Sequence, residues 1–518
     1  MNFNEPHIDY AGISPLIALT VGICVVLLSA VFKPTKRWAP GLTTIALGAT
    51  AGLLIWQWDD PKPLITGALR LDDLAISISL IAILTAGSCV VLSLRERATE
   101  EAGSGEYHSL LLGSVLGMVL LAQATNLVSF FVALETLSIP LYILCATNLR
   151  REGSLESGLK YLIVGSIGSA TLLYGMAFLY GGTGATNFAG IADGIARNGL
   201  DGDPLILIGI AMAAVGLAFK TSIAPFHQWT PDVYQGAPTP ITAFMAVATK
   251  AAAFAVFLRF FDVALGSQVD EWQPALAALA AITIVIGNVG ALGQNSLKRL
   301  LGYSGVAQAG YMLVGLLVGS IAGLDALVFY LAAYTLINFA AFAVIAIRER
   351  ETPLGDDIAA VQGIGKDRPA LAWPLTISML ALAGLPGTAG FMGKLFLIEA
   401  AVAGDYTWLG VFIVVGSMIS LAYYLRVIAA VWMRPAPRLA PAIAGAAPEA
   451  GDSEPALPSR TGKPGRALDG GPSGGRCWLV LGTIVITTAA TIVFGIVPSP
   501  LIDFSIHAGQ GIRSMLGF

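Results

Sequence analysis

The sequence predicts an all-α polytopic membrane protein with about fourteen transmembrane helices, two inverted five-helix repeats, and breaks in helices 7 and 12. Hydrophobic residues make up 56% of the 518 positions and charged residues only 12%, whereas soluble domains average roughly 25% charged residues. Apolar runs long enough to cross a hydrocarbon core of roughly 30 Å recur along the chain. Lysine and arginine gather in alternate loops, as they do in multi-spanning membrane proteins.

The first three runs form an N-terminal three-helix segment, residues 1–106. No basic residue precedes the first run, so the N-terminus does not resemble a cleavable signal peptide. Each run holds about twenty mainly apolar residues, the length of a helix that spans a bilayer. The fourteen expected spans are residues 13–32, 38–58, 74–94, 107–125, 127–147, 157–180, 204–229, 240–264, 273–294, 297–321, 326–347, 368–403, 408–433 and 478–497.

Basic residues divide unequally between the two sides of this fourteen-helix arrangement. Because cytoplasmic loops carry the excess of lysine and arginine, the basic-rich side should be cytoplasmic and both termini should face outward. The basic-rich side holds Lys33, Lys36, Arg37, Arg95, Arg97, Arg150, Arg151, Lys298, Arg299, Arg348, Arg350, Lys366, Arg368 and the basic residues from Arg434 onward, and the other side holds Lys62, Arg70, Arg197, Arg259 and Arg513.

Two units of similar length follow the N-terminal segment. Residues 107–264 hold helices 4 to 8 and residues 272–433 hold helices 9 to 13. Because five is an odd number, consecutive units of five helices insert in opposite senses, as in many ion transporters. The fourth helix of each unit is irregular, with the sequences GLAFKTSIAPFHQW and LALAGLPGTAGFMGKLFLIEA.

Each irregular helix combines a proline with a lysine. Pro225 follows Lys220 by five residues, and Pro386 precedes Lys394 by eight. Proline removes a helix hydrogen bond, and open backbone at membrane depth survives only where protein or a water-filled cavity satisfies it. A plain proline kink is the alternative, but two breaks at matching repeat positions favour a functional arrangement.

The last part of the chain is a linker followed by one helix. Residues 434–476 are rich in alanine, proline and glycine, which predicts a flexible cytoplasmic tether rather than a partner-binding segment. Residues 477–518 hold the fourteenth helix, and only a short tail is expected after it.

Four ionisable residues lie near the middle of expected spans: Glu135, Lys220, Lys250 and Lys394. Each costs at least ~2.5 kcal/mol to insert, so such residues usually mark ion pathways. Lys250 lies about ten residues, or roughly 15 Å, inside its helix, too deep to reach the membrane surface. An unpaired buried ammonium tends to release its proton. The four side chains therefore predict a line of proton-carrying groups, with water and hydroxyls between them.

Glu135 and Lys220 allow two interpretations. They can form an inert ion pair that fixes helix packing. Alternatively, a carboxylate at ~6 Å is worth about 3 kcal/mol to a lysine in a medium of effective dielectric constant near 20, enough to load or unload its proton as the distance changes. The inert pair leaves Lys250 and Lys394 unexplained, so the second interpretation is preferred.

Other polar residues are weaker candidates. His227 can relay protons near neutral pH, although a packing role is equally compatible with a single histidine at a helix end. Arg426 can steer protons at an exit or form a structural ion pair, and Tyr303 and Tyr311 are expected to pack. The scattered cysteines and histidines predict no iron–sulfur, haem or zinc site. The net charge of -4 implies no nucleic-acid partner.

At these residues the sequence resembles the antiporter-like membrane subunits of NADH:quinone oxidoreductase, respiratory complex I. The resemblance runs from about residue 107 to 433 and includes FVALETLSIPLYIL, PFHQWTPDVYQGAPTPITAF and NSLKRLLGYSGVAQAGYML. It implies fourteen helices with two inverted five-helix repeats. It also implies a Glu–Lys pair matched by Glu135 and Lys220, a central lysine matched by Lys250, and a terminal residue on the broken twelfth helix matched by Lys394.

The resemblance also implies the chemistry around the chain. The chain is expected to be a proton-translocating subunit of an enzyme in a bacterial plasma (inner) membrane, with no cofactor and no redox chemistry of its own. NADH, FMN, iron–sulfur clusters and quinone are then expected on partner subunits, and the partners include subunit M and the small K, J and A subunits. A subunit of a Mrp-type cation/proton antiporter and a scaffold with a static channel are the alternatives.

Within the family, subunit M carries glutamate at the position of Lys394, and subunit L has a long lateral C-terminal helix. This sequence follows neither pattern. The linker at residues 434–476 is unusual for the remaining branch, which leaves local contacts with neighbouring subunits in doubt.

Overall fold

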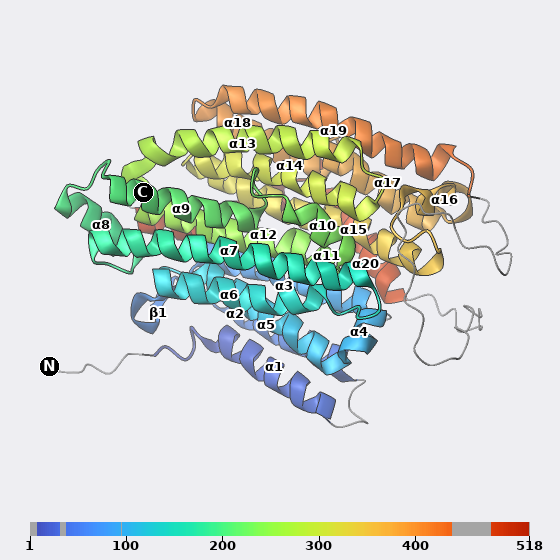
Figure 1. The fold of residues 1–518 in the computed structure, drawn as a ribbon, viewed down its shortest axis with the longest axis horizontal. Coiled ribbons are helices and arrows are strands. Elements are labelled where there is room, and N and C mark those ends of the chain that lie inside the picture. Colours follow the sequence, from blue (N-terminus) through green and yellow to red (C-terminus); the bar gives the residue numbers. More distant parts are fainter. Residues whose placement is uncertain (1–7, 32–37, 95, 438–477, 517–518) are drawn as a thin grey trace.

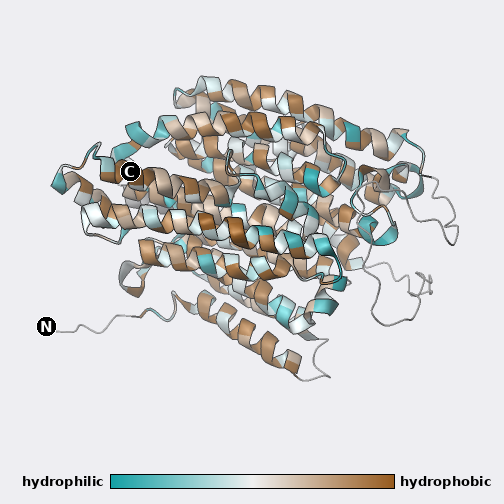
Figure 2. Ribbon diagram, in the orientation of Figure 1, coloured by the Kyte–Doolittle hydropathy of each residue, from teal (hydrophilic) through white to brown (hydrophobic). Residues whose placement is uncertain are grey.

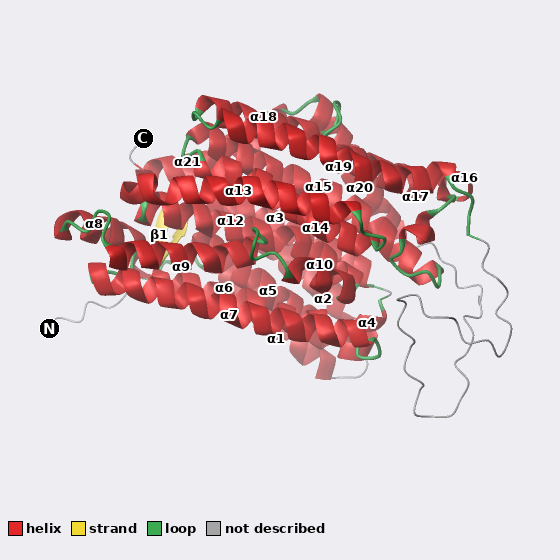
Figure 3. Cartoon of the chain, turned by 45° about the horizontal axis from the view of Figure 1, so that its top comes forward, coloured by secondary structure: helices red, strands yellow, loops and turns green. Residues whose placement is uncertain are grey.

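The chain is described by a computed structural model over residues 8–31, 38–94, 96–437 and 478–516, with backbone alone for residues 511–516. Residues 438–476 of the expected linker lie outside the described residues. The described chain is helical apart from one antiparallel hairpin, in which Lys62 pairs with Leu71 and Leu64 with Leu69 (Figure 3). The fold class predicted from composition is confirmed.

The N-terminal segment has three long helices. Asp72 caps the third of them, because its carboxylate accepts a hydrogen bond from the Ala75 backbone N–H at 3.0 Å. The elements are α1 (Ser14–Val31), α2 (Ala39–Trp56), β1 (Lys62–Leu64), the 3₁₀ turn η2 (Ile65–Gly67), β2 (Leu69–Leu71), α3 (Asp73–Ser93) and the short α4 (Arg97–Ala102).

The first five-helix unit contains a break where the sequence predicts one. The short helix α8 follows α7, the third long helix of the unit. Helix α9 ends before Pro225, at the predicted break. The elements are α5 (Ser104–Gln123), α6 (Leu127–Cys145), α7 (Glu152–Thr183), α8 (Phe188–Asn198), α9 (Pro204–Thr221), α10 (Trp229–Gly236), α11 (Thr239–Phe244), the π turn η3 (Met245–Thr249), α12 (Lys250–Arg259) and the π turn η4 (Phe260–Ala264).

The second unit has a matching break between α17 and α18, on either side of Pro386. The elements are the 3₁₀ turn η5 (Gly266–Gln268), α13 (Val269–Leu292), α14 (Leu297–Leu317), α15 (Ile321–Glu351), the 3₁₀ turn η6 (Ile358–Val361), α16 (Ile364–Asp367), α17 (Pro369–Ala383), α18 (Ala389–Ala403) and α19 (Thr407–Met433).

The C-terminus differs from the sequence-based expectation. The fourteenth span is α20 (Trp478–Ile496), but a further helix, α21 (Ser499–Leu516), follows it and packs against α3 and α15. The expectation of only a short tail was wrong, because polar residues such as Asp503 and His507 interrupt the apolar pattern that hydropathy detects. Among the described residues the ring of Phe504 lies 6.1 Å from that of Trp58, which fixes α21 at the end of α2.

Thirteen helices of the described chain are long and apolar enough to span a membrane, and the fifteen-residue α17 is a shorter apolar helix that the break around Pro386 separates from α18. They lie side by side, with α8 and β1 toward one end of the bundle and α4 and α16 toward the other (Figure 1). The most hydrophilic stretches gather toward these two ends (Figure 2). The inverted relation of the two units stays a prediction.

The centre of the bundle consists of the segment from α11 to η4 together with α14 and α15, which are the most buried spans. Small residues bring these helices close together. A Cβ atom on Gly315 of α14 would lie only 3.0 Å from the Gly323 carbonyl oxygen of α15. Such close backbone contact between helices is typical of membrane proteins. Lys220, Lys250 and Lys394 all lie in or against this centre.

Candidate functional site

The three predicted lysines are enclosed by protein. Lys220 is 3% exposed, Lys250 1% and Lys394 4%. Their helices pack in succession, because α9 contacts α12, α12 contacts α14, and α14 contacts α18. Among the residues that the structure describes, each ammonium is held by neutral acceptors and none forms an ion pair with a carboxylate.

Lys220 ends α9 inside a cage of hydroxyls and aromatic rings. Its Nζ donates to Ser138 Oγ at 2.8 Å and to Tyr161 Oη at 3.0 Å. The Tyr161 ring stacks on Trp229 with a centroid distance of 4.7 Å and an angle of 11°. Because both hydroxyls can donate as well as accept, they can hold either an amine or an ammonium.

Glu135 does not contact Lys220 directly. It lies on α6 one turn before Ser138, which provides the actual contact, and its Oε1 is buried without a hydrogen bond among the described residues. The structure therefore shows no direct ion pair between Glu135 and Lys220, and the hydroxyl that Lys220 contacts on α6 is that of Ser138. Sequence spacing cannot show this difference, because it depends on a few ångströms of side-chain reach.

The break after Lys220 is stabilised by local hydrogen bonds. Ser222 adopts φ 66°, which ends α9, and the Ile223 N–H donates back to the Ala218 carbonyl at 2.8 Å. Trp229 Nε1 donates to the Phe219 carbonyl at 3.1 Å. His227 lies in the same turn, nearly buried, with Nδ1 lacking a hydrogen bond in the described structure. No contact joins His227 to Lys220 there, so its relay role stays a prediction.

Lys250 follows the π turn η3 directly, and π turns are frequent at functional sites. Its Nζ donates to the Gly305 carbonyl of α14. Space here is tight, because a Cβ on Gly305 would lie 3.0 Å from Lys250 Nζ and 3.1 Å from Tyr334 Oη. Glycine at position 305 thus leaves room for the ammonium. Neither the π turn nor this contact has a signal in the sequence.

Lys394 uses the break in its own helix pair. Gly384 adopts φ 87° and ends α17, leaving carbonyls without intrahelical partners. Lys394 Nζ donates to the Leu382 carbonyl at 2.8 Å, the Ala383 carbonyl at 3.2 Å and Ser417 Oγ at 3.0 Å. The broken helix thus supplies two carbonyl acceptors to Lys394. The acceptors around Lys220 are hydroxyls instead.

A polar network that the sequence did not reveal lies beside Lys250 and Lys394. Tyr311 lies under Lys394 Nζ, 5.0 Å from the ring centroid, and accepts from Asn288 Nδ2 at 3.0 Å. Tyr423 donates to Asn288 Oδ1 at 3.0 Å, and Ser304 and Tyr424 share a hydrogen bond. Tyr311 therefore does more than pack, contrary to the expectation.

The structure also bears on the expectations for Arg426 and Tyr303. Arg426 donates to the Leu292 carbonyl at 3.1 Å and forms no ion pair with the described residues, so the expected structural ion pair is absent from this part of the chain. Tyr303 is half-buried, with its ring 5.9 Å from the Arg299 guanidinium carbon. Its packing role agrees with the structure.

Sequence reasoning also missed two buried ionic contacts at opposite ends of the bundle. Asp72 and Arg259 form an ion pair in which both side chains are fully buried. At the other end, Lys298 lies 3.5 Å from Glu349, which Arg151 also contacts at 2.9 Å. Both clusters join helices that are distant in sequence. Only the fold brings their members together.

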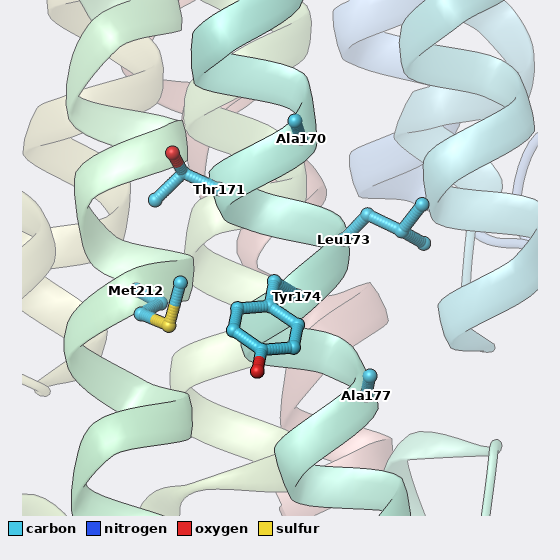
Figure 4. Close-up of a pocket in the computed structure, with 6 residues that line it drawn as sticks. All are labelled: Ala170, Thr171, Leu173, Tyr174, Ala177 and Met212. Carbon is cyan, nitrogen blue, oxygen red and sulfur yellow. The ribbon is translucent and has the colours of Figure 1, made fainter.

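A surface hollow of about 620 Å³ lies apart from these lysines. It sits between α7 and α9 and is almost wholly apolar (Figure 4). The hydroxyl of Thr171 in its wall donates to its own helix at Ile167. The candidate site is thus a buried line of side chains rather than a ligand pocket. The hollow is lined by Ala170, Thr171, Leu173, Tyr174, Ala177 and Met212.

Comparison with known proteins identifies the class to which this arrangement is similar. Residues 124–420 match the family described as "NADH:quinone oxidoreductase/Mrp antiporter, TM". A relative in Trichlorobacter lovleyi, NADH-quinone oxidoreductase subunit N, is 39% identical over 425 residues, which cover 82% of this chain and 87% of the relative. The family match over residues 124–420 contains Glu135, Lys220, Lys250 and Lys394.

The solved structures with a similar fold include chains of a respiratory complex I and of a Mrp complex. A chain of respiratory complex I from Thermus thermophilus matches with a TM-score of 0.75 and 33% identity, covering 94% of this chain and 98% of the other. A chain of the Mrp complex from Dietzia sp. matches with a TM-score of 0.76 but 22% identity, covering 96% of each. The fold alone does not separate the two complexes, whereas sequence identity favours the first.

Proposed function

The chain belongs to the NADH:quinone oxidoreductase/Mrp antiporter membrane family, and we propose that it is a proton-translocating subunit, of the subunit N type, in a bacterial complex I. The observation that carries the proposal is the series Lys220, Lys250 and Lys394, each buried and held only by neutral acceptors among the described residues. A lysine so placed can take and release a proton, because no carboxylate holds it in the charged state.

Glu135 is the residue at which the free energy that drives proton transfer enters this chain. It lies on α6 beside Val132 and Ile139, whose side chains are 53% and 52% exposed on the outside of the bundle. A neighbouring subunit that packs on this face can therefore change the charge or position of Glu135. Because Glu135 lies one helical turn from Ser138, the residue of α6 that Lys220 contacts, such a change alters how firmly Lys220 holds its proton.

Protons then pass along the line of lysines. They are taken up from the cytoplasmic side toward Lys220 or Lys250 and leave by way of Lys394. The network of Asn288, Tyr311 and Tyr423 supplies hydroxyl and amide groups beside the last step. His227 assists proton transfer at the first break.

The redox chemistry belongs to partner subunits of the complex. NADH, FMN, iron–sulfur clusters and quinone are bound there, and this chain contributes no cofactor site. Its partners are subunit M and the small K, J and A subunits, and both termini face outward. A role in a Mrp-type cation/proton antiporter is the second candidate, because the Dietzia chain has the same fold. Sodium-dependent proton movement without NADH would support that candidate.

Lys220→Met tests the proposal, with Lys366→Met as the control. Lys366 is an exposed lysine of α16, outside the buried line. In membrane vesicles supplied with NADH, Lys220→Met should lower the protons moved per NADH while Lys366→Met should not. Unchanged proton movement in Lys220→Met, with the complex assembled, would leave this chain as a static scaffold.

A further inference from the structure

A cluster of ion pairs joins three helices beside the break after Lys220. Asp232 on α10 accepts a hydrogen bond from Lys160 of α7 through Oδ2 at 3.1 Å, and its Oδ1 pairs with Arg299 of α14. Lys160 also contacts Glu156 at 2.6 Å, and Arg299 reaches Gln235 at 3.3 Å. The carboxylate of Asp232 thus joins α7, α10 and α14.

One arm of this cluster leads to Lys220. Trp229 lies one turn before Asp232 on α10, and its ring stacks on Tyr161, the residue that follows Lys160 on α7. Tyr161 Oη accepts a hydrogen bond from Lys220 Nζ. Trp229 Nε1 also donates to the Phe219 carbonyl, next to Lys220. A shift of α10 relative to α7 would therefore change both the hydroxyl and the backbone beside the ammonium.

The other arm leads to Lys250. Arg299 lies on α14 six residues before Gly305, whose carbonyl accepts the hydrogen bond from Lys250 Nζ. The helices α10 and α14 approach closely, since a Cβ on Gly302 would lie 3.1 Å from Pro231 Cα. Because a helix moves as a rigid element over two turns, a shift of α14 at Arg299 is carried to the acceptor of Lys250.

The side chains of this cluster are partly exposed, which distinguishes the cluster from a buried ion pair that serves only to stabilise the fold. The side chains of Asp232, Lys160 and Arg299 are 34%, 44% and 29% exposed. Ion pairs at this exposure contribute little to stability. They are suited to a contact that forms and opens with small changes in helix position.

We infer that Asp232 is a positioning residue that couples Lys220 to Lys250 by setting α10 against α7 and α14 together. This inference rests on the proposed proton-transfer function. It assigns a task to a residue that belongs neither to the buried line nor to the bundle core.

The test compares three variants in the intact complex, in vesicles supplied with NADH. Asp232→Asn removes the charge, Asp232→Glu keeps it, and Asp193→Asn is the matched control. Asp193 forms an ion pair with Arg197 at 2.9 Å on α8, away from the lysines. The readouts are the amount of assembled complex, the rate of NADH oxidation, and the protons moved per NADH.

Asp232→Asn should assemble at near normal levels and lower the protons per NADH by at least half the loss seen in Lys220→Met. Asp232→Glu should recover most of that loss, and Asp193→Asn should match the unaltered protein. If Asp232→Asn does not assemble, Arg299→Gln, which opens only the α14 arm, is read by the same criteria.

Three outcomes would overturn the inference. These are a normal proton ratio in the charge-removing variant, an equal loss in Asp193→Asn, or an equal loss in Asp232→Glu, which would indicate packing alone. If Lys220→Met also moves protons normally, the proposed function itself fails. If only Asp232→Asn behaves normally, the proposed function stands and this inference does not.

Discussion

The number of acceptors around each buried amine differs along the line. Among the described residues Lys250 has one acceptor, Lys220 has two and Lys394 has three. An ammonium has three N–H donors, so only Lys394 has a partner for each of them. Lys250 keeps donors open for water or a neighbouring group. This difference suits Lys250 to a transient station and Lys394 to a site that holds charge.

Ser417→Ala should weaken the hold on charge at Lys394. The serine supplies one of three acceptors, and a hydrogen bond to a charged group is worth roughly 1.5–3 kcal/mol. The number of protons moved per NADH should fall, by up to several-fold, while the amount of assembled complex stays unchanged. Ser420→Ala is the control, because its hydroxyl donates only to the Ser417 carbonyl in the described structure. Equal effects of the two substitutions would contradict the assigned role of Ser417.

At the level of helices, the two breaks occupy matching positions in the two units, but their free carbonyls accept hydrogen bonds from different groups. At the α17–α18 break, the carbonyls of Leu382 and Ala383 hold Lys394. At the α9–α10 break, backbone N–H groups and Trp229 occupy the corresponding carbonyls, and Lys220 turns to Ser138 and Tyr161. A proline near a lysine predicts a break, but the partners depend on which neighbouring helices supply hydroxyls.

The same limit explains how much of the site was predictable. Hydropathy located the spans, and the rarity of charge in them located Glu135 and the lysines. The contact between Tyr423 and Asn288 joins residues 135 positions apart. Its existence depends on the packing of α19 on α13, which no local pattern encodes. The π turn before Lys250 was missed because it does not change the apolar content of its span, and helix α21 was missed because its polar residues interrupt the apolar pattern.

Asp72→Asn tests how α3 is tied to the end of α12. Asparagine keeps the cap on α3, but it leaves Arg259 with a weaker partner in a fully buried site. Removing one partner of a buried ion pair costs about 3–5 kcal/mol. The amount of subunit in the membrane should fall strongly. Asp60→Asn, which weakens an exposed contact with Lys62, should leave it unchanged.

In the whole molecule, the buried charges run across the bundle rather than along it, because successive neighbouring helices carry them. A proton that crosses the membrane must therefore approach the line from one end and leave it toward the other. The ionic clusters lie near these ends, with Lys298 and Glu349 at one and Asp72 and Arg259 at the other. The direction of transport is thus defined only once the orientation of the bundle is known.

Cysteine labelling tests that orientation. Arg197 on α8 and Lys366 on α16 are exposed and lie toward opposite ends of the bundle (Figure 1). In a background with the four native cysteines replaced by serine, Lys366→Cys should react with an impermeant maleimide only in inside-out vesicles. Arg197→Cys should react only in right-side-out vesicles, because the basic-rich side faces the cytoplasm. The reverse pattern would place Lys298 and Glu349 outside, and proton uptake toward Lys220 would then have to start from the opposite face.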